Sequence, residues 1–131
     1  MKAKTMREKL FGYAAERYGA QPEYLWKKTP QHGVLRRSDN DKWFAVIMLV
    51  DGSKIGREKG VIYDIVNIKC SPLMTGSLLA MDGIVPAYHM NKEGWVSVLL
   101  DGSVDETQVM SLLDMSYELT GQSGRAVRTS R

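Results

Sequence analysis

The side chains best suited to chemistry in this sequence stand together just before an alternating apolar run. An imidazole titrates near neutrality and a lysine supplies a fixed positive charge, so the cluster suits acid–base or anion-binding chemistry. Its members are Tyr88, His89, Asn91, Lys92 and Trp95. Because the cluster holds neither a paired carboxylate nor a nucleophile, we favour a plainer interpretation. His89 and Asn91 then satisfy backbone groups at a strand end, and Lys92 is solvated.

Known catalytic and cofactor motifs are missing around this cluster. The sequence has no P-loop, dinucleotide fingerprint, nucleophile elbow or zinc-type spacing. His32, Cys70 and His89 lie too far apart in the sequence to indicate a ligand set. We therefore predict that the protein is not an enzyme and uses no metal and no cofactor.

Length and composition indicate one globular domain. The chain has 131 residues, of which 44% are hydrophobic and 25% are charged, enough for a core that needs no metal or disulfide. Its single cysteine, Cys70, cannot close an internal disulfide, which fits a reducing compartment. No segment approaches the about 20 apolar residues that a membrane span requires. We predict a cytoplasmic protein that does not enter a membrane.

Hydrophobic spacing and turn residues divide the sequence into two long helices, one short helix and five strands. Thr5 and Glu8 match a capping box that opens a helix ending near residue 18. Ser103 and Glu106 match a second box, which opens a helix ending at Gly121. Strands are predicted at residues 34–37, 43–50, 61–69, 84–89 and 95–100. A short helix capped by Ser71 is predicted to begin at Pro72, with an apolar side at Leu73, Met74, Leu78 and Leu79.

This order of elements predicts an α+β fold built as a two-layer sandwich. An antiparallel sheet of about five strands is covered on one face by the N- and C-terminal helices, and the short helix lies between strands three and four. We assign residues 1–121 to a single domain and residues 122–131 to a flexible basic tail. The aromatic side chains expected in the core are Trp26, Tyr88, Trp95 and Tyr117.

Charge is nearly balanced in total but is separated along the chain. Lys and Arg number 18 against 15 Asp and Glu, and the excess equals the three arginines Arg125, Arg128 and Arg131. Residues 27–59 hold eight basic and four acidic groups, whereas residues 82–121 hold one basic and seven acidic groups. Such separation can create a basic face that binds nucleic acid. The alternative is a solvated hairpin of mixed charge.

The polar cluster also resembles the signature of a known family. Residues 86–102, with 67–72 upstream and Ser116-Tyr117 downstream, resemble the MmcQ/YjbR family over roughly residues 6–121. The resemblance implies a two-layer fold likened to that of CyaY and of secretion chaperones, and it implies DNA binding. Family members often carry a histidine just before the signature tryptophan, where this chain has Gly94. A role that needs this imidazole is therefore not expected here.

Two functions of different classes remain open from the sequence. In the first, the hairpin at residues 36–42 and the loop at 54–59 act as basic wings on duplex DNA, with weak sequence specificity and strong salt dependence. The residues expected to contact phosphates are Arg36, Arg37, Lys42, Lys54, Arg57 and Lys59. The alternative is a protein-interaction or chaperone-like domain that binds a protein partner, and no nucleic acid, through its exposed sheet face and acidic last helix.

Overall fold

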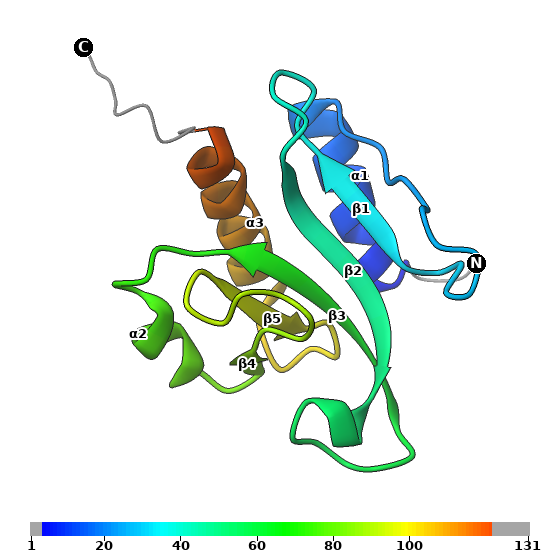
Figure 1. Cartoon of the computed structure of the whole chain (residues 1–131), viewed down its shortest axis with the longest axis vertical. Coiled ribbons are helices and arrows are strands. Elements are labelled where there is room, and N and C mark those ends of the chain that lie inside the picture. The colour runs from blue at the N-terminus through cyan, green and yellow to red at the C-terminus, as the bar shows by residue number, and fades with distance from the viewer. Residues whose placement is uncertain (1–3, 122–131) are drawn as a thin grey trace.

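The computed structural model describes residues 4–121 and contains three α-helices, one short 3-10 helix and five strands (Figure 1). The helices are α1 (Met6–Tyr18), α2 (Thr75–Leu79), α3 (Glu106–Gly121) and the 3-10 helix η1 (Gly52–Lys54). The strands are β1 (Gly33–Arg36), β2 (Trp43–Asp51), β3 (Ile62–Lys69), β4 (Ile84–Pro86) and β5 (Trp95–Leu99). The predicted tail lies outside the described residues. No helix within residues 4–121 is long and apolar enough to cross a membrane.

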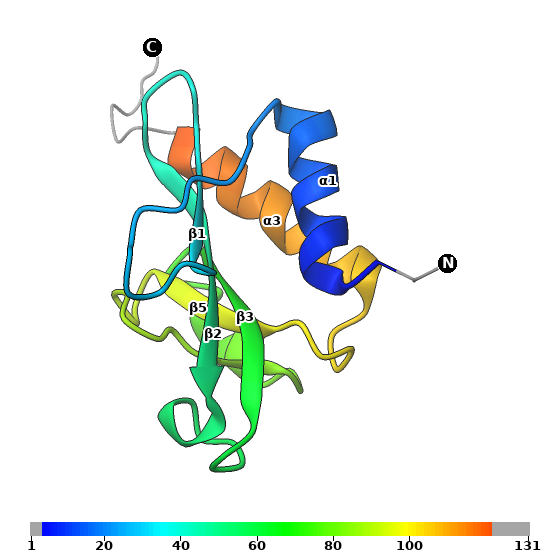
Figure 2. The same ribbon diagram turned by 90° about the vertical axis from the view of Figure 1, so that its right-hand side faces the viewer.

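The sheet forms one layer of the molecule, and α1 and α3 form the other (Figure 2). Its strands are all antiparallel to their neighbours, in the order β1-β2-β3-β5-β4. Alternate residues such as Ile47, Val66 and Val96 join the core beneath the helices. Val46 and Leu99 belong to a second apolar cluster on the opposite, helix-free face. The predicted two-layer α+β sandwich is confirmed.

Local capping chemistry sets the start and the end of α1. The Thr5 hydroxyl accepts a hydrogen bond from the Glu8 amide at 3.1 Å, and the Glu8 carboxylate accepts one from the Thr5 amide at 2.9 Å. This is the predicted capping box. Gly19 ends the helix in the left-handed conformation, with φ of 69°, and its amide donates to Ala15.

The start of α3 differs from the prediction. Asp105 stands directly before the helix, and its carboxylate accepts a hydrogen bond from the Thr107 amide at 3.0 Å. Ser103 instead donates its hydroxyl hydrogen to Asp101 at 2.6 Å. The proposed capping box of Ser103 and Glu106 is therefore wrong, because Ser103 is already committed to the preceding turn.

Helix α2 also begins later than predicted. Residues 72–74 form a turn in which the Met74 amide donates to the Ser71 carbonyl, and the helix starts at Thr75 without a side-chain cap. Only Leu78 on this helix is buried, whereas Leu73 is 94% exposed. The expected apolar side is wrong, since the turn directs Leu73 into solvent.

An irregularity in the pairing of β1 with β2 places Phe44 in the main core. The register shifts between Leu35, which faces Ala45, and Arg36, which faces Trp43, so that Phe44 is the extra residue of a bulge. Phe44 is fully buried and meets the rings of Tyr18 and Tyr117 edge-on, with centroids 5.3 and 4.9 Å away. Trp43 joins the helix-free cluster instead. The bulge thus supplies aromatic side chains to both faces.

One buried hydroxyl ties α3 to two strands. Ser116 is fully buried, and its Oγ donates to the Phe44 carbonyl of β2 at 2.5 Å. The same oxygen accepts a hydrogen bond from the Lys69 amide of β3 at 2.8 Å. Both strands therefore depend on a single side chain to satisfy these backbone groups.

Of the four aromatic residues predicted in the core, Tyr117, which lies on α3, packs against the core as expected. Trp95 is only half-buried, because Val96 and Val98 take the helix-facing positions of β5. Its ring instead lies 5.6 Å from the Lys69 ammonium. Tyr88 packs on the cluster of the helix-free face, and Trp26 is 37% exposed. The core assignment is wrong for Trp26 and Trp95, whereas Tyr88 packs on an apolar core cluster of the other face and not beside the last helix.

Candidate functional site

A hollow of about 530 Å³ opens on the helix-free face of the sheet. Val46, Met48 and Val50 of β2 contribute to its lining. Its remaining lining includes residues of two loops, 20–32 and 87–94, which reach this side of the sheet away from α1 and α3 (Figure 2). The aromatic and imidazole side chains that line it are Trp26, His32, Trp43, Tyr88 and His89. We call this hollow the aromatic pocket.

The loop before β1 is held to the sheet by a short bridge. Glu23 and Val34 exchange both backbone hydrogen bonds at 2.9 Å, which extends the edge of β1 by one residue. The chain then carries Trp26 to the pocket, where its ring meets that of Trp43 edge-on with centroids 6.0 Å apart. His32 Nε2 lies 3.2 Å from the Leu49 carbonyl, so this nitrogen carries the donated hydrogen.

The opposite wall is fixed by two buried polar side chains. Asn67 and Ser97 are both fully buried, and the Ser97 hydroxyl donates to the Asn67 carbonyl oxygen. The Tyr88 amide donates to Ser97 Oγ at 3.0 Å, and the Tyr88 carbonyl accepts from Asn67 Nδ2 at 2.8 Å. β4 was predicted to reach His89 but ends at Pro86. Beyond Pro86 the backbone of Tyr88 bonds to the side chains of Asn67 and Ser97 and not to a neighbouring strand. Tyr88 is thereby held in one position.

The residues of the signature cluster serve different places in the structure. Tyr88 and His89 line the aromatic pocket, with ring centroids 4.0 Å apart. His89 adopts φ of 61°, a left-handed conformation that is costly for a residue with a Cβ atom. The Asn91 side chain accepts from the Glu93 amide at 2.8 Å, and Lys92 donates to the Ala87 carbonyl at 2.8 Å. Of the five residues, Tyr88 and His89 therefore line the aromatic pocket, whereas Asn91, Lys92 and Trp95 do not.

Two charged groups stand at one end of the aromatic pocket, Asp51 and Lys54. The Asp51 carboxylate accepts hydrogen bonds from the hydroxyl and the amide of Ser53 and from the Gly60 amide. These bonds, led by that from the Ser53 hydroxyl, lower the pKa of Asp51. The carboxylate is therefore ionised and committed to its own loop. Lys54 is exposed and makes no salt bridge within the described residues.

Two of the six arginines and lysines predicted to bind DNA have internal partners. Arg36 pairs with Glu23 at 3.2 Å. Arg37 pairs with Asp39 at 2.7 Å, donates to the Tyr117 carbonyl at 2.5 Å and lies 3.9 Å from the centre of the Tyr117 ring. These contacts raise the pKa of Arg37, chiefly through the hydrogen bonds to Asp39. Arg37 thus anchors the hairpin to α3.

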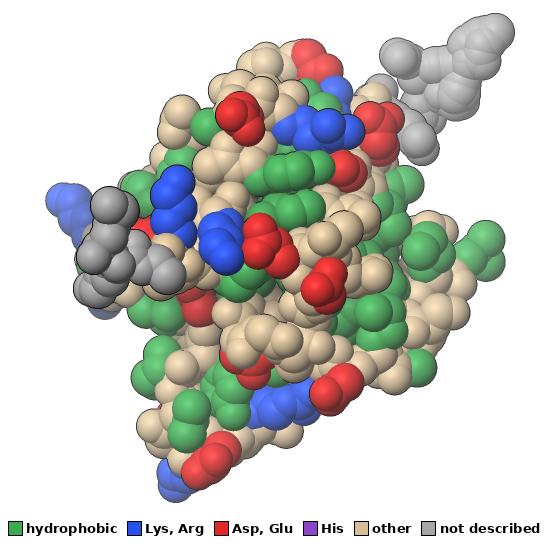
Figure 3. Space-filling model, turned by 180° about the vertical axis from the view of Figure 1, so that it is seen from behind, with side chains coloured by type: hydrophobic (Ala, Val, Ile, Leu, Met, Phe, Trp, Pro, Cys, Tyr) green, Lys and Arg blue, Asp and Glu red, His purple; other side chains and the backbone are tan. Residues whose placement is uncertain are grey.

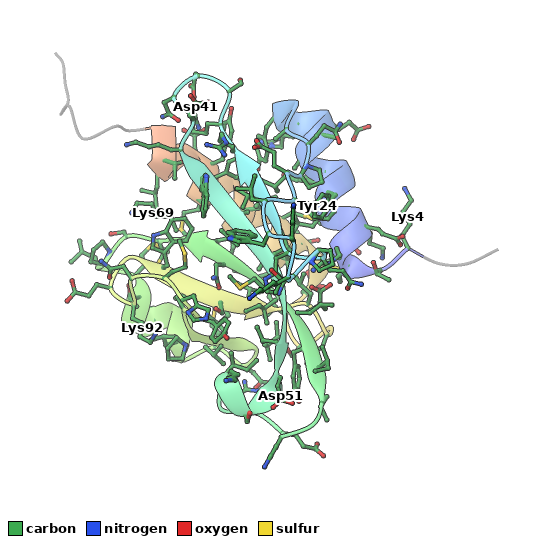
Figure 4. The ribbon with its side chains drawn as sticks, turned by 45° about the vertical axis from the view of Figure 1, so that its right-hand side comes forward. Lys4, Tyr24, Asp41, Asp51, Lys69 and Lys92 are labelled. Atoms are coloured by element: carbon green, nitrogen blue, oxygen red, sulfur yellow. The ribbon has the colours of Figure 1, made fainter. Side chains whose placement is uncertain are left out.

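The structure does not bring the six basic residues to one place. Lys42 follows the hairpin turn, whereas Lys54, Arg57 and Lys59 lie in the loop after β2. The nine residues of β2 separate the two regions by about 30 Å. Figure 4 shows this separation through Asp41 in the turn and Asp51 at the start of the loop. Figure 3 shows the molecule from behind the view of Figure 1, and acidic and basic side chains are interspersed on that face.

Both histidines of the chain line the aromatic pocket, although they lie in opposite halves of the sequence. Their large separation in the sequence argued against a shared site, and no local sequence pattern indicates that the two histidines lie at the same pocket. Cys70 is buried in the core beneath the helices, away from both. Within residues 4–121, no three His, Cys, Asp or Glu side chains are grouped so as to hold a metal ion.

Comparison with known proteins identifies the family. The YjbR family model matches residues 15–119. The chain belongs to the YjbR family. It is 38% identical over 114 residues to the uncharacterized protein YyaQ of Bacillus subtilis, covering 87% of this chain and 97% of YyaQ. It is 39% identical over 54 residues to the uncharacterized protein YjbR of Escherichia coli, covering 40% of this chain and 46% of that protein.

Solved structures agree with this assignment. A Pseudomonas syringae protein with a crystal structure is 41% identical and superimposes with a TM-score of 0.85, over 87% of this chain and 97% of that one. A Deinococcus radiodurans protein of 21% identity superimposes with a TM-score of 0.69, over 96% of this chain and 83% of that one, and shows the same fold. The YjbR fold is thus shared, while the names of these relatives assign no ligand.

Proposed function

We propose that this YjbR-family protein is a binding domain for a small ligand with a flat aromatic group. The observation that carries the proposal is the aromatic pocket itself, in which Trp26, Trp43 and Tyr88 surround a hollow of about 530 Å³. Pockets for small molecules commonly measure about 300 to 1,000 Å³ and are lined mainly by apolar and aromatic side chains. Aromatic rings in turn favour edge-on or offset contacts with other rings.

The exposure of the loop beside the pocket supports the same function. Tyr24, Leu25 and Trp26 are consecutive, and 52%, 47% and 37% of their respective surfaces are exposed. A run of large apolar side chains in solvent costs free energy and commonly marks a binding site. The pocket is also preformed, since Asn67 and Ser97 hold one wall. A preformed site loses little entropy when a ligand binds.

Binding without turnover accounts best for the polar groups in the pocket. The His32 imidazole is hydrogen-bonded to the Leu49 carbonyl, and neither histidine bonds to a nucleophile or a carboxylate within the described residues. A histidine paired with a protein nucleophile is typical of covalent catalysis. A protein partner that inserted an aromatic side chain would satisfy the same pocket, so the protein-interaction alternative is a variant of this proposal.

Indole, a small neutral probe, tests the proposal by NMR titration. We expect the amide signals of Thr29, Tyr88, His89 and Met90 to shift together as indole is added. Trp26→Ala should weaken binding about tenfold, because stacking on an aromatic side chain contributes about 1 to 3 kcal/mol. Trp95→Ala is the matched control, since Trp95 lies outside the pocket and its loss should leave the indole affinity unchanged.

Two outcomes would contradict the proposal. One is the absence of any shift at low millimolar indole in a folded sample. The other is a set of shifts centred on a different surface, such as the exposed side chains of Leu73 and Met74 near α2.

Duplex DNA binding is a second candidate function, favoured by one specific observation. Lys54, Arg57 and Lys59 lie close together in the loop after β2 and make no salt bridge within the described residues. They remain available for phosphates, unlike Arg36 and Arg37. In this proposal the loop after β2 is therefore the main contact to the phosphates, and Lys42 adds a contact from the other end of β2.

The salt dependence of binding to an arbitrary duplex tests this second candidate. If the loop binds phosphates, the joint change Lys54→Ala, Arg57→Ala and Lys59→Ala should reduce the slope of log affinity against log salt by up to about 2.7, at about 0.9 for each contact. Arg125→Ala, Arg128→Ala and Arg131→Ala remove the same charge from the tail as a matched control. Equal binding by the loop variant and the full chain would rule the loop out.

A further inference from the structure

A second hollow of about 290 Å³ adjoins the aromatic pocket. Lys54 and Tyr88 line both hollows, so the two hollows are neighbours that share these two side chains. The backbone around Pro86 and Ala87 contributes to the wall of the smaller hollow, together with Ile55. We call it the lysine hollow, because Lys92 completes its lining.

The charges around the lysine hollow are of one sign. Its lining contains the two lysines Lys54 and Lys92 and no acidic residue. Lys92 uses one ammonium hydrogen on the Ala87 carbonyl at 2.8 Å, which leaves two donors free and holds the group in place. Figure 4 shows Lys92 and Asp51 on different segments of the chain. The charged side chains that line the lysine hollow are thus both positive.

Asp51 is the acidic residue that lines the neighbouring aromatic pocket. Its oxygens accept hydrogen bonds from Ser53 and Gly60, which orient the carboxylate toward its own loop. It lies farther than 4.0 Å from the Lys54 ammonium, since the two form no salt bridge. Counting Asp51, Lys54 and Lys92 together, the joined hollows carry a net positive charge. An anionic ligand is complementary to that charge.

We infer that the ligand is an aromatic acid: its ring occupies the aromatic pocket and its carboxylate lies between the ammonium groups of Lys54 and Lys92. This inference rests on the proposed function, because it names the class of ligand for the same pocket. An aromatic-lined hollow thus lies beside one whose two charged lining residues are both lysines, and this pairing suggests the two halves of the molecule. Tyr88, held by Asn67 and Ser97, sets the distance between them.

A pair of probes of almost equal shape isolates the contribution of the charge. Indole-3-acetate and indole-3-acetamide differ mainly in the carboxylate, so their affinity ratio measures recognition of the anion. We expect the acid to bind at least about fivefold more tightly at low salt, as partly exposed charged hydrogen bonds allow. The ratio should fall as the salt concentration rises, because salt screens exposed charges.

Two variants identify the residues responsible. Lys54→Gln with Lys92→Gln should bring the affinity ratio of acid to acetamide close to one, because the two ammonium groups that favour the carboxylate are removed. Lys59→Gln is the matched control: Lys59 belongs to the same loop as Lys54 but lines neither hollow, and its loss should preserve the ratio.

Each outcome separates the inference from the proposed function. Equal affinity for the two probes in the wild-type protein would overturn the inference and leave the aromatic pocket in place. A ratio that survives in the double glutamine variant would overturn the assignment to Lys54 and Lys92. Failure of both probes and of indole to bind would overturn the proposed function, and the inference with it.

Discussion

Replacing Phe44 by alanine is expected to lower the free energy of unfolding by about 3 to 5 kcal/mol, the range for truncating a buried aromatic side chain. Phe44 is fully buried, and its ring meets those of Tyr18 on α1 and Tyr117 on α3. The cavity left by the truncation therefore opens at the junction of the sheet with both helices. Urea unfolding followed by circular dichroism measures the loss.

The other phenylalanine of the chain provides a matched control. Phe11 on α1 is only half-buried. Phe11→Ala therefore removes the same atoms from a more solvent-exposed position and should lower the free energy of unfolding clearly less. If Phe44→Ala does not fold, Phe44→Leu still measures the site, with an expected loss of about 1 to 2 kcal/mol. Losses of the same size at positions 11 and 44 would mean that the bulge does not direct Phe44 into the core.

The second large effect is expected at Ser116. Ser116→Ala should cost about 2 to 6 kcal/mol, because it leaves the Phe44 carbonyl and the Lys69 amide without their partner, at about 1 to 3 kcal/mol for each buried group. Hydrogen exchange should also accelerate at the Lys69 amide. This second measurement distinguishes the loss of the hydrogen bond from a general loosening of the helix.

Ser111 on the same helix is the matched control. It is exposed, so Ser111→Ala should be neutral or slightly stabilising, because alanine has the higher helix propensity. Similar stabilities for the two variants would show that water replaces the Ser116 hydroxyl at no cost.

The parts of the fold that depend on neighbouring residues were predictable from the sequence. The capping box of Thr5 and Glu8 and the hairpin before β2 follow from chemistry within a few residues. The start of α3 was missed because two polar residues competed for the cap, and Asp105 lies closer to the helix than Ser103. The start of α2 was missed because the turn after Ser71 is set by backbone bonding.

The candidate site could not be predicted, because it depends on contacts between distant segments. The pairing of Arg37 with Tyr117 joins the first hairpin to the last helix, and no local pattern indicates it. The same holds for Asn67 and Ser97, whose burial in neighbouring strands fixes Tyr88. The sequence does show that Asn67 and Ser97 are polar residues within apolar strands. That they face each other becomes clear only once β3 and β5 are known to be neighbours in the sheet.

The aromatic pocket also has a consequence for folding. Trp26 and Tyr88 come from opposite halves of the chain, so the pocket is complete only when the loops that carry them meet over β2. A ligand bound there cannot stabilise a partly folded hairpin, and its binding energy is added to the native state as a whole. At a concentration one hundred times its dissociation constant, such a ligand raises the free energy of unfolding by about 2.7 kcal/mol. Resistance to proteolysis across the entire domain would then depend on the supply of a small molecule.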